Sequence, residues 1–243
     1  MKITGYELVK FEGKAERPIG DANGPQGSDY VGMSILIIDT DEGLQGFAPL
    51  GNDYIKNIFP VIENQDPRSI KGLWKKMTDL VFKDGNEGEK NQAISALDIA
   101  LWDLKAKINN EPLWKTLGAN TNLVKAYASG IDMCLDDNEI STFYGRMAQK
   151  GIDAGKLKVG LDFESDLNRI SIMKEKLSVN NNRPHICIDS NEFWSPKQAI
   201  RYINEIENKF DITWAEEPAR RWDYAGLKKV SDGIKGAVAT GEN

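Results

Sequence analysis

The stretch HICIDSN, residues 185–191, is a short apolar run that ends in the polar side chains of Asp189, Ser190 and Asn191. Similar aliphatic runs recur on both sides of it, separated by stretches typical of polar, amphipathic helices. The predicted strands are Val124–Gly130, Gly155–Val159, His185–Asp189, Thr213–Glu216 and Ala237–Gly241. The predicted helices span residues 137–150, 163–178, 196–209 and 223–233. This alternation predicts a parallel sheet, either an open doubly wound layer or a (β/α)8 barrel. No GxGxxG motif follows the first of these strands, so a dinucleotide-binding fold has little support.

Chargeable side chains stand at the carboxyl ends of four of these strands. The segments are Lys156-Leu157-Lys158, Asp189-Ser190-Asn191, Glu216-Glu217-Pro218 and Glu242-Asn243. They follow one another at intervals of about one βα unit, roughly 30 residues. Because equivalent strand ends converge on one mouth of a parallel barrel, we expect these groups to share a site. His185 lies at the start of its strand, away from that mouth, and is interpreted as a structural residue.

Three of these groups, Asp189, Glu216 and Glu242, are carboxylates, which are the hard oxygen ligands that Mg²⁺ prefers. Zinc is disfavoured because the sequence has no cluster of cysteine and histidine. A divalent cation at this point would stabilise the enediolate that forms when a carboxylate substrate loses its α proton. A purely structural alternative is that the acids cap helices, and Asp189 or Ser195 could cap the helix that follows.

Lys156 and Lys158 are two residues apart in a predicted strand, so their side chains share one face. Their mutual repulsion and the nearby cation are expected to lower the pKa of the amine, which favours a neutral base near pH 7. An isolated pair of lysines with this spacing is usually solvated, but this pair is one of four polar strand ends that recur at the same interval. The chemistry that fits is metal-assisted abstraction of a proton next to a carboxylate.

The first half of the chain has a different pattern, typical of an antiparallel meander followed by helices. The predicted strands are Lys2–Lys10, residues 31–38 and Leu44–Ala48. The predicted helices run from Asp66 to Phe82, from Lys90 to Ile108 and over a short turn from Pro112 to Gly118. The apolar positions of the second helix are Ile94, Leu97, Ile99, Ala100, Leu101, Leu104 and Ile108. Residues 18–29, PIGDANGPQGSD, are so rich in glycine and proline that we expect no regular structure there, but a flexible connection or a lid over a site.

The composition excludes several classes of protein. The chain has 243 residues, 40% hydrophobic and 28% charged, which is enough for a buried core in one or two domains. Its net charge of −6 and the lack of a basic patch argue against nucleic-acid binding. No apolar run approaches the roughly 20 residues of a membrane span, and the N-terminus has no signal-peptide core. With Cys134 and Cys187 interpreted as reduced, buried thiols, we expect a soluble cytoplasmic protein.

At these motifs the chain resembles the enolase superfamily, in particular its mandelate racemase-like group. The barrel motifs KxK, DxN, EEP and GEN all match, and the stretch AISALDIALWDLKAK, residues 93–107, is similar to the hallmark helix of the family's capping domain. The resemblance covers nearly the whole chain. It implies an α+β capping domain, with a meander and helices, over residues 1–120. An incomplete (β/α) TIM-type barrel with about five of the usual strands would follow over residues 121–243.

The resemblance also implies roles for individual residues. Lys158 would be the catalytic base, and Lys156 would tune it and touch the substrate carboxylate. Asp189, Glu216 and Glu242 would bind Mg²⁺, with Mn²⁺ as an alternative, and Glu217 would be turned the other way by strand alternation. Asn191 and Asn243 would contact the substrate or a water on the metal. The segment 18–29, with residues 50–54, would close over the substrate and exclude water.

The family barrel has about three more strands, so we expect a truncated product or an incomplete chain, without the His–Asp dyad of the later strands. Five strands cannot close a barrel of eight, and the exposed edges would favour a homo-oligomer. The predicted activity is that of an acid-sugar dehydratase acting on a small carboxylate substrate. A racemase, epimerase or cycloisomerase of the same superfamily is the alternative, and a fragment that only binds metal is another.

Overall fold

The computed structural model describes residues 1–85 and 87–242, which form two compact units. The first unit comprises residues 1–13 and 31–124, and the second comprises residues 14–30 and the chain from residue 125 onward. The glycine-rich segment therefore belongs with the second unit, although it lies early in the sequence. Each unit has its own hydrophobic core.

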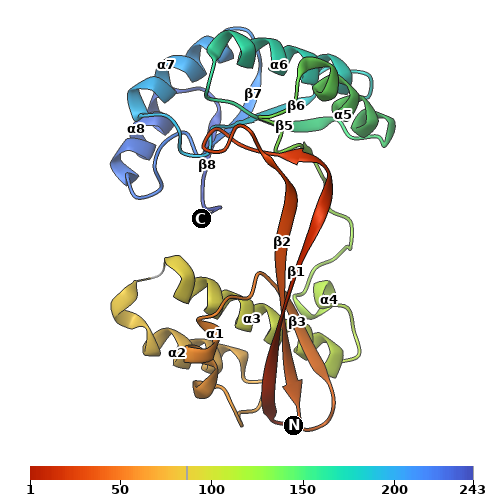
Figure 1. Cartoon of the computed structure of the whole chain (residues 1–243), viewed down its shortest axis with the longest axis vertical. Helices are drawn as coiled ribbons and strands as arrows, with labels where there is room; N and C mark the ends of the chain where they lie inside the picture. The colour runs from red at the N-terminus through yellow and green to blue at the C-terminus, as the bar shows by residue number, and fades with distance from the viewer. Residues whose placement is uncertain (86, 243) are drawn as a thin grey trace. The chain divides into compact units, whose positions relative to one another are not determined.

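The first sheet is the antiparallel meander that the sequence predicts (Figure 1). Its strands, in spatial order, are β1 (Ile3–Ile19), β2 (Ser28–Thr40) and β3 (Gln45–Pro49). The expectation that residues 18–29 have no regular structure is wrong at both ends, because β1 continues to Ile19 and β2 begins at Ser28. Backbone pairing along this long hairpin stabilises an extended conformation that glycine and proline do not favour by themselves.

Helices cover the sheet within the first unit. They are α1 (Ile55–Ile58), the 3-10 turns η1 (Phe59–Val61) and η2 (Phe82–Asp84), α2 (Ile70–Leu80), α3 (Gly88–Ile108) and α4 (Leu113–Thr116). Helix α3 packs closely on β3, since a Cβ atom on Gly46 would lie 2.2 Å from the carbonyl oxygen of Ala100. Leu97 and Leu101 of α3 are fully buried in the core of the first unit. Ile99 was expected on the same face, but its side chain is 43% exposed.

The second sheet is entirely parallel, as predicted, and its strands lie side by side in sequence order. They are β4 (Ala128–Ser129), β5 (Ala154–Lys158), β6 (His185–Asp189), β7 (Ile212–Glu216) and β8 (Ala237–Ala239). Strand β4 is much shorter than the predicted run Val124–Gly130. The apolar side chain of Val124 is 90% exposed, so this run has no buried surface to pack against.

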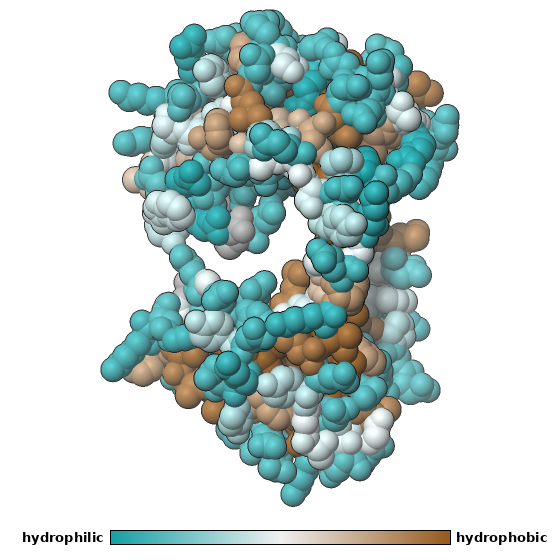
Figure 2. All heavy atoms as spheres, viewed as in Figure 1, coloured by the Kyte–Doolittle hydropathy of each residue, from teal (hydrophilic) through white to brown (hydrophobic). Residues whose placement is uncertain are grey.

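Four helices cover one face of this sheet, and each follows a strand in the chain (Figure 1). They are α5 (Asp137–Gln149), α6 (Phe163–Leu177), α7 (Pro196–Glu207) and α8 (Tyr224–Gly233). All four agree with the predicted ranges to within two residues at each end. On the face seen in Figure 2 these helices present mostly hydrophilic side chains, with hydrophobic ones visible between them. Ser195 caps α7 through a reciprocal bond with Gln198, so the helix-capping alternative holds for Ser195.

The two cysteines are free thiols, with Cys187 buried and Cys134 partly exposed. Burial raises the pKa of the Cys187 thiol to about 12, so this sulfur stays protonated and unreactive near neutral pH. Within the described part of the chain, none of the helices combines the length and the apolar character that crossing a membrane requires.

Candidate active site

The parallel register of the second sheet places three of the predicted site residues in one row. Lys158 of β5 lies opposite Asp189 of β6, which lies opposite Glu216 of β7. Each is the last residue of its strand, so the row marks the carboxyl edge of the sheet. His185 is the first residue of β6 and pairs with Ala154, at the other end of the strands. The histidine therefore lies away from the row, as predicted.

The three predicted metal ligands come together at this edge. Asp189, Glu216 and Glu242 each offer a carboxylate oxygen, and these oxygens all lie within 4.8 Å of one another. Asp189 is fully buried, Glu216 is half-buried and Glu242 is exposed, so the group opens toward solvent on one side. The donor set consists only of oxygen atoms, and it therefore fits Mg²⁺ better than a metal that prefers nitrogen or sulfur.

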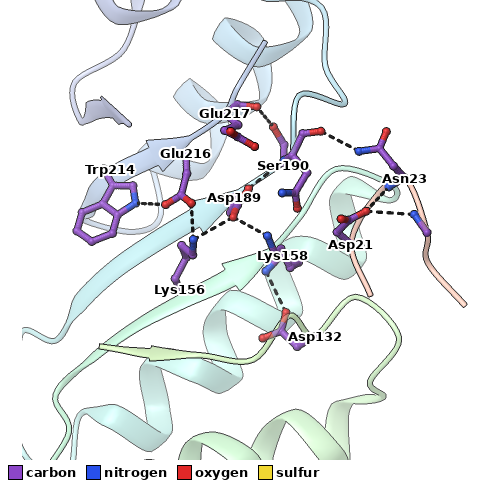
Figure 3. Close-up of polar contacts among 12 residues, drawn as sticks. Asp21, Asn23, Asp132, Lys156, Lys158, Asp189, Ser190, Trp214, Glu216 and Glu217 are labelled. Carbon is purple, nitrogen blue, oxygen red and sulfur yellow. Dashed lines mark hydrogen bonds and ion pairs between the residues drawn. The ribbon is translucent and has the colours of Figure 1, made fainter. Parts of the chain in front are cut away.

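Both predicted lysines face the carboxylates (Figure 3). The Nζ atom of Lys158 lies 2.7 Å from Oδ2 of Asp189, and the Nζ atom of Lys156 lies 3.1 Å from the same oxygen. Lys156 also forms an ion pair with Glu216, whose other oxygen accepts a hydrogen bond of 3.1 Å from Nε1 of Trp214. Two buried amines and two carboxylates thus form one network.

Neighbouring carboxylates determine the direction of the pKa shift of Lys156. Burial of the ammonium group lowers its pKa, but the hydrogen bond to Glu216 and the attraction of Asp189 raise it more, and the net result lies above the usual value. The expectation of a lowered pKa was made for the catalytic base beside a bound cation, and the direction of the shift at Lys156 does not test it.

Asn191 is the second residue after β6 and is buried. Its backbone N–H donates to Oδ1 of Asp189 at 2.9 Å, which helps to fix that carboxylate. Its side-chain oxygen has no hydrogen-bond partner among the described residues, so it is available to a ligand. Asn243, the other predicted contact residue, lies outside the described residues.

Part of the glycine-rich segment is held next to this edge of the second unit. The side-chain amide of Asn23, which Figure 3 labels, donates to the carbonyl oxygen of Asn191 at 2.8 Å. Gly20 pairs with the loop after β4, because its N–H donates to Ile131 and its carbonyl accepts from Met133. A Cβ atom on Gly20 would lie 2.6 Å from the carbonyl oxygen of Gly24, so this turn requires glycine.

Sequence reasoning did not assign a role to two buried acids, Glu192 and Glu217. Glu217 was expected to point away by strand alternation, but it lies past the end of β7 with a φ of 45°, where alternation no longer applies. Burial raises the pKa of its carboxyl group, and the charges of Glu242 and Asp189 raise it further. Glu192 forms an ion pair with Arg221. The adjacent glutamates at 216 and 217 were the available signal for a larger acidic site.

Comparison with known families gives two matches that together span most of the chain. Residues 16–118 match the family described as mandelate racemase / muconate lactonizing enzyme, N-terminal domain. Residues 140–243 match the family described as enolase C-terminal domain-like. The boundary between the matches agrees with the change from meander to parallel sheet.

Among curated relatives, the chain is 35% identical over 225 residues to 3,6-anhydro-alpha-L-galactonate cycloisomerase of Streptomyces coelicolor, covering 88% of the chain and 61% of that relative. It is 32% identical over 232 residues to L-talarate/galactarate dehydratase of Salmonella typhimurium, covering 92% of the chain and 54% of that relative. The chain therefore spans between half and two thirds of the length of these relatives.

Among solved structures, the chain is similar to a racemase from Streptomyces coelicolor that was crystallised with bound magnesium. The TM-score is 0.88 at 27% sequence identity, and the similarity covers 99% of the chain and 69% of the racemase.

Proposed function

The chain belongs to the enolase superfamily, with the two domains of its mandelate racemase/muconate lactonizing enzyme members, and on that premise we propose that it performs magnesium-dependent proton abstraction next to a carboxylate. Its parallel sheet supplies five strands of the TIM-type barrel of that superfamily. One observation carries the proposal: three carboxylates converge within 4.8 Å, and the Lys158 amine lies 2.7 Å from one of them.

In this proposal Asp189, Glu216 and Glu242 hold the cation, Mg²⁺ or alternatively Mn²⁺. The all-oxygen donor set and the unpartnered side-chain oxygen of Asn191 among the described residues support this assignment. A divalent cation bound there would stabilise the negative charge that develops on the substrate's carboxylate oxygens as the α proton leaves.

Lys158 is the proposed base, and its Nζ atom would accept the α proton. Lys156 is the proposed partner of the substrate carboxylate, since its Nζ atom lies beside Asp189 and Glu216 at the edge where the substrate would bind. Asn191, and Asn243 by its position after Glu242, would contact the substrate. The side chains of Lys156 and Lys158 are themselves buried, and burial strengthens their electrostatic interactions with neighbouring charges.

For the overall reaction we favour dehydration of a sugar acid. The relative from Salmonella is a dehydratase whose name gives two such acids, and the chain is 32% identical to it. A racemase, epimerase or cycloisomerase is the second candidate, because the relatives from Streptomyces carry two of those names. All these reactions share the first proton abstraction, so the residues above have the same roles in each.

The experiment is hydrogen exchange in D₂O with Mg²⁺ and a panel of sugar acids, followed by mass spectrometry of the recovered acid. We expect deuterium at the α carbon with wild-type protein and at least a ~100-fold slower exchange with Lys158→Ala. Loss of water from the acid identifies a dehydratase, whereas inversion with deuterium uptake identifies a racemase or epimerase. Lys197→Ala, at an exposed position on α7, is the matched control and should exchange at the wild-type rate.

Cation binding is measured separately by calorimetry. We expect Asp189→Asn to weaken Mg²⁺ binding by at least ~10-fold, while Glu205→Gln on the exposed face of α7 leaves it unchanged. Equal affinity of wild type and Asp189→Asn would exclude the proposed cation site. Cation binding without exchange of any acid would restrict the chain to a metal-binding role.

A further inference from the structure

Strand β5 extends beyond the end of its neighbour β4, toward the carboxyl edge of the sheet where the site residues lie. The β4–β5 ladder ends at Ser129 and Lys156, because the chain leaves β4 after Ser129. In a parallel sheet both backbone groups of a residue point to the same neighbouring strand, and alternate residues point to opposite sides. The N–H of Val159 donates to Asp189 in β6, so the backbone groups of Lys158 point to the side where β4 is missing.

Two buried side chains bind these backbone groups instead. The N–H of Lys158 donates to Oδ1 of Asp132 at 2.9 Å, as Figure 3 shows. The carbonyl oxygen of Lys158 accepts from Nη1 of Arg169 at 2.8 Å. Both peptide groups that flank the Cα atom of the proposed base are thus held by side chains from outside the sheet.

The two side chains also hold each other. Nη2 of Arg169 donates to the carbonyl oxygen of Asp132 at 2.7 Å and lies 3.4 Å from Oδ1 of the same residue. The hydroxyl group of Tyr144 lies 2.8 Å from Oδ2 of Asp132 and donates to the carbonyl oxygen of Lys156 at 2.7 Å. Asp132 and Tyr144 are fully buried, and Arg169 is 4% exposed.

Hydrogen bonding of the Lys158 backbone does not by itself require the charged side chains of Asp132 and Arg169. Two more residues of β4 could satisfy the same backbone groups, whereas burial of a carboxylate and a guanidinium group costs several kcal/mol before they attract each other. The ion pair of Asp132 and Arg169 differs from an extended β4 in what it connects to Lys158. It ties Lys158 to the loop after β4 through Asp132 and to helix α6 through Arg169, so the backbone at Lys158 is fixed from two directions.

We propose that Asp132 and Arg169 are positioning residues for Lys158, which replace the missing strand and fix the backbone from which the base extends. This inference rests on the proposed function of Lys158. Displacement of a reacting group by about 1 Å can slow a reaction by roughly 100-fold, so a mobile backbone at this point lowers the rate without weakening substrate binding.

The main test is backbone hydrogen–deuterium exchange of the peptide that contains the Lys158 amide. We expect Asp132→Ala to lower the protection of this amide by at least ~10-fold, because the only acceptor described for it is gone. Asp132→Asn keeps an acceptor oxygen at the same place and should restore protection to within ~3-fold of wild type. Arg169→Met, which removes the donor to the Lys158 carbonyl, should lower protection as Asp132→Ala does.

Asp166→Asn is the matched control. Asp166 is equally buried and lies 3.6 Å from Arg169, but it accepts from the N–H of Gly160 and does not contact Lys158. Protection of the Lys158 amide should not fall in this variant. Unchanged protection in both Asp132→Ala and Arg169→Met would overturn the proposal, and so would an equal loss in Asp166→Asn.

The kinetic readout separates this proposal from the proposed function. If wild type exchanges the α proton of an acid, Asp132→Ala should lower kcat by ~10- to 100-fold. The KM and the Mg²⁺ affinity of this variant should stay within ~3-fold of the wild-type values. Asp132→Asn should recover most of kcat. An unchanged kcat despite lost protection would refute the positioning role and leave the proposed function intact. Absence of exchange in wild type would refute the proposed function, while the amide measurement still decides whether Asp132 and Arg169 hold Lys158. If Asp132→Ala does not fold, Arg169→Met and Asp132→Asn provide the same comparison.

Discussion

Asp166 is a buried carboxyl group whose titration should be visible in the stability of the protein. Burial raises its pKa from 3.8 to about 6, although the N–H of Gly160 and the charge of Arg169 act in the opposite direction. Between about pH 4 and pH 6 the folded state retains a proton that the unfolded state has released. The contribution of Asp166 to the free energy of unfolding therefore falls as pH rises through this range and is constant above it.

We predict that Asp166→Asn removes this part of the pH dependence. The difference between the two pKa values corresponds to about 3 kcal/mol, which is the upper limit of the effect. Relative to wild type, the variant should gain about 1–3 kcal/mol in free energy of unfolding between pH 4 and pH 7, measured by urea denaturation at a series of pH values. Parallel pH profiles of the two proteins would contradict the prediction.

At the level of single residues, spacing was informative where backbone geometry determines the direction of a side chain. Lys156, Lys158, Asp189, Glu216 and Glu242 were selected because they follow strands at regular intervals, and the structure brings these five together. Their catalytic and ligand roles remain predictions.

Asp132 and Arg169 could not be selected from the sequence. They lie in a loop and in a helix, and no spacing rule relates them to Lys158.

At the level of elements, helix α3 offers a direct comparison of two neighbouring aliphatic residues. Leu97 is fully buried, while Ile99 is 43% exposed. We predict that Leu97→Ala lowers the free energy of unfolding by about 2–5 kcal/mol, because it removes buried apolar surface and leaves a cavity. Ile99→Ala should change it by less than about 1 kcal/mol, and chemical denaturation of both variants provides the measurement. Equal losses in the free energy of unfolding for the two variants would contradict this prediction.

The elements that the sequence predicted well are those with strong periodicity and clear ends. Helices α5 to α8 have amphipathic faces, and their N-terminal residues include capping side chains such as Asp136, Asp162 and Ser195. Strand β4 was overestimated, because apolar character indicates a strand only if a surface exists to bury it. The short helix α1 was missed, since four residues do not show a helical period.

At the level of the whole molecule, the two units carry separate cores, and the proposed cation site lies in the second unit. We predict that Mg²⁺ at 100 times its dissociation constant raises the free energy of unfolding of the second unit by about 2.7 kcal/mol, through preferential binding to the folded state. The unfolding transition of the first unit should not change. Fluorescence-monitored urea denaturation with and without chelator measures both.

The control for this prediction is Glu242→Gln. Glu242 is the exposed member of the cation site, so its substitution should weaken binding without disturbing the core. Stabilisation of the variant by Mg²⁺ to the same extent as wild type would indicate general ionic effects instead of a specific site.

The common register of Lys158, Asp189 and Glu216 has a consequence for how such a gene can change over time. Deletion of the single codon for Ile186 would shift Asp189 by one position and turn its carboxylate toward the helices, because side chains alternate along a strand. Replacement of the same codon by one for valine would leave the row intact. Insertions and deletions should therefore accumulate in the loops between strands, and a library of one-codon deletions across residues 186–189 should yield no clone that retains Mg²⁺ affinity.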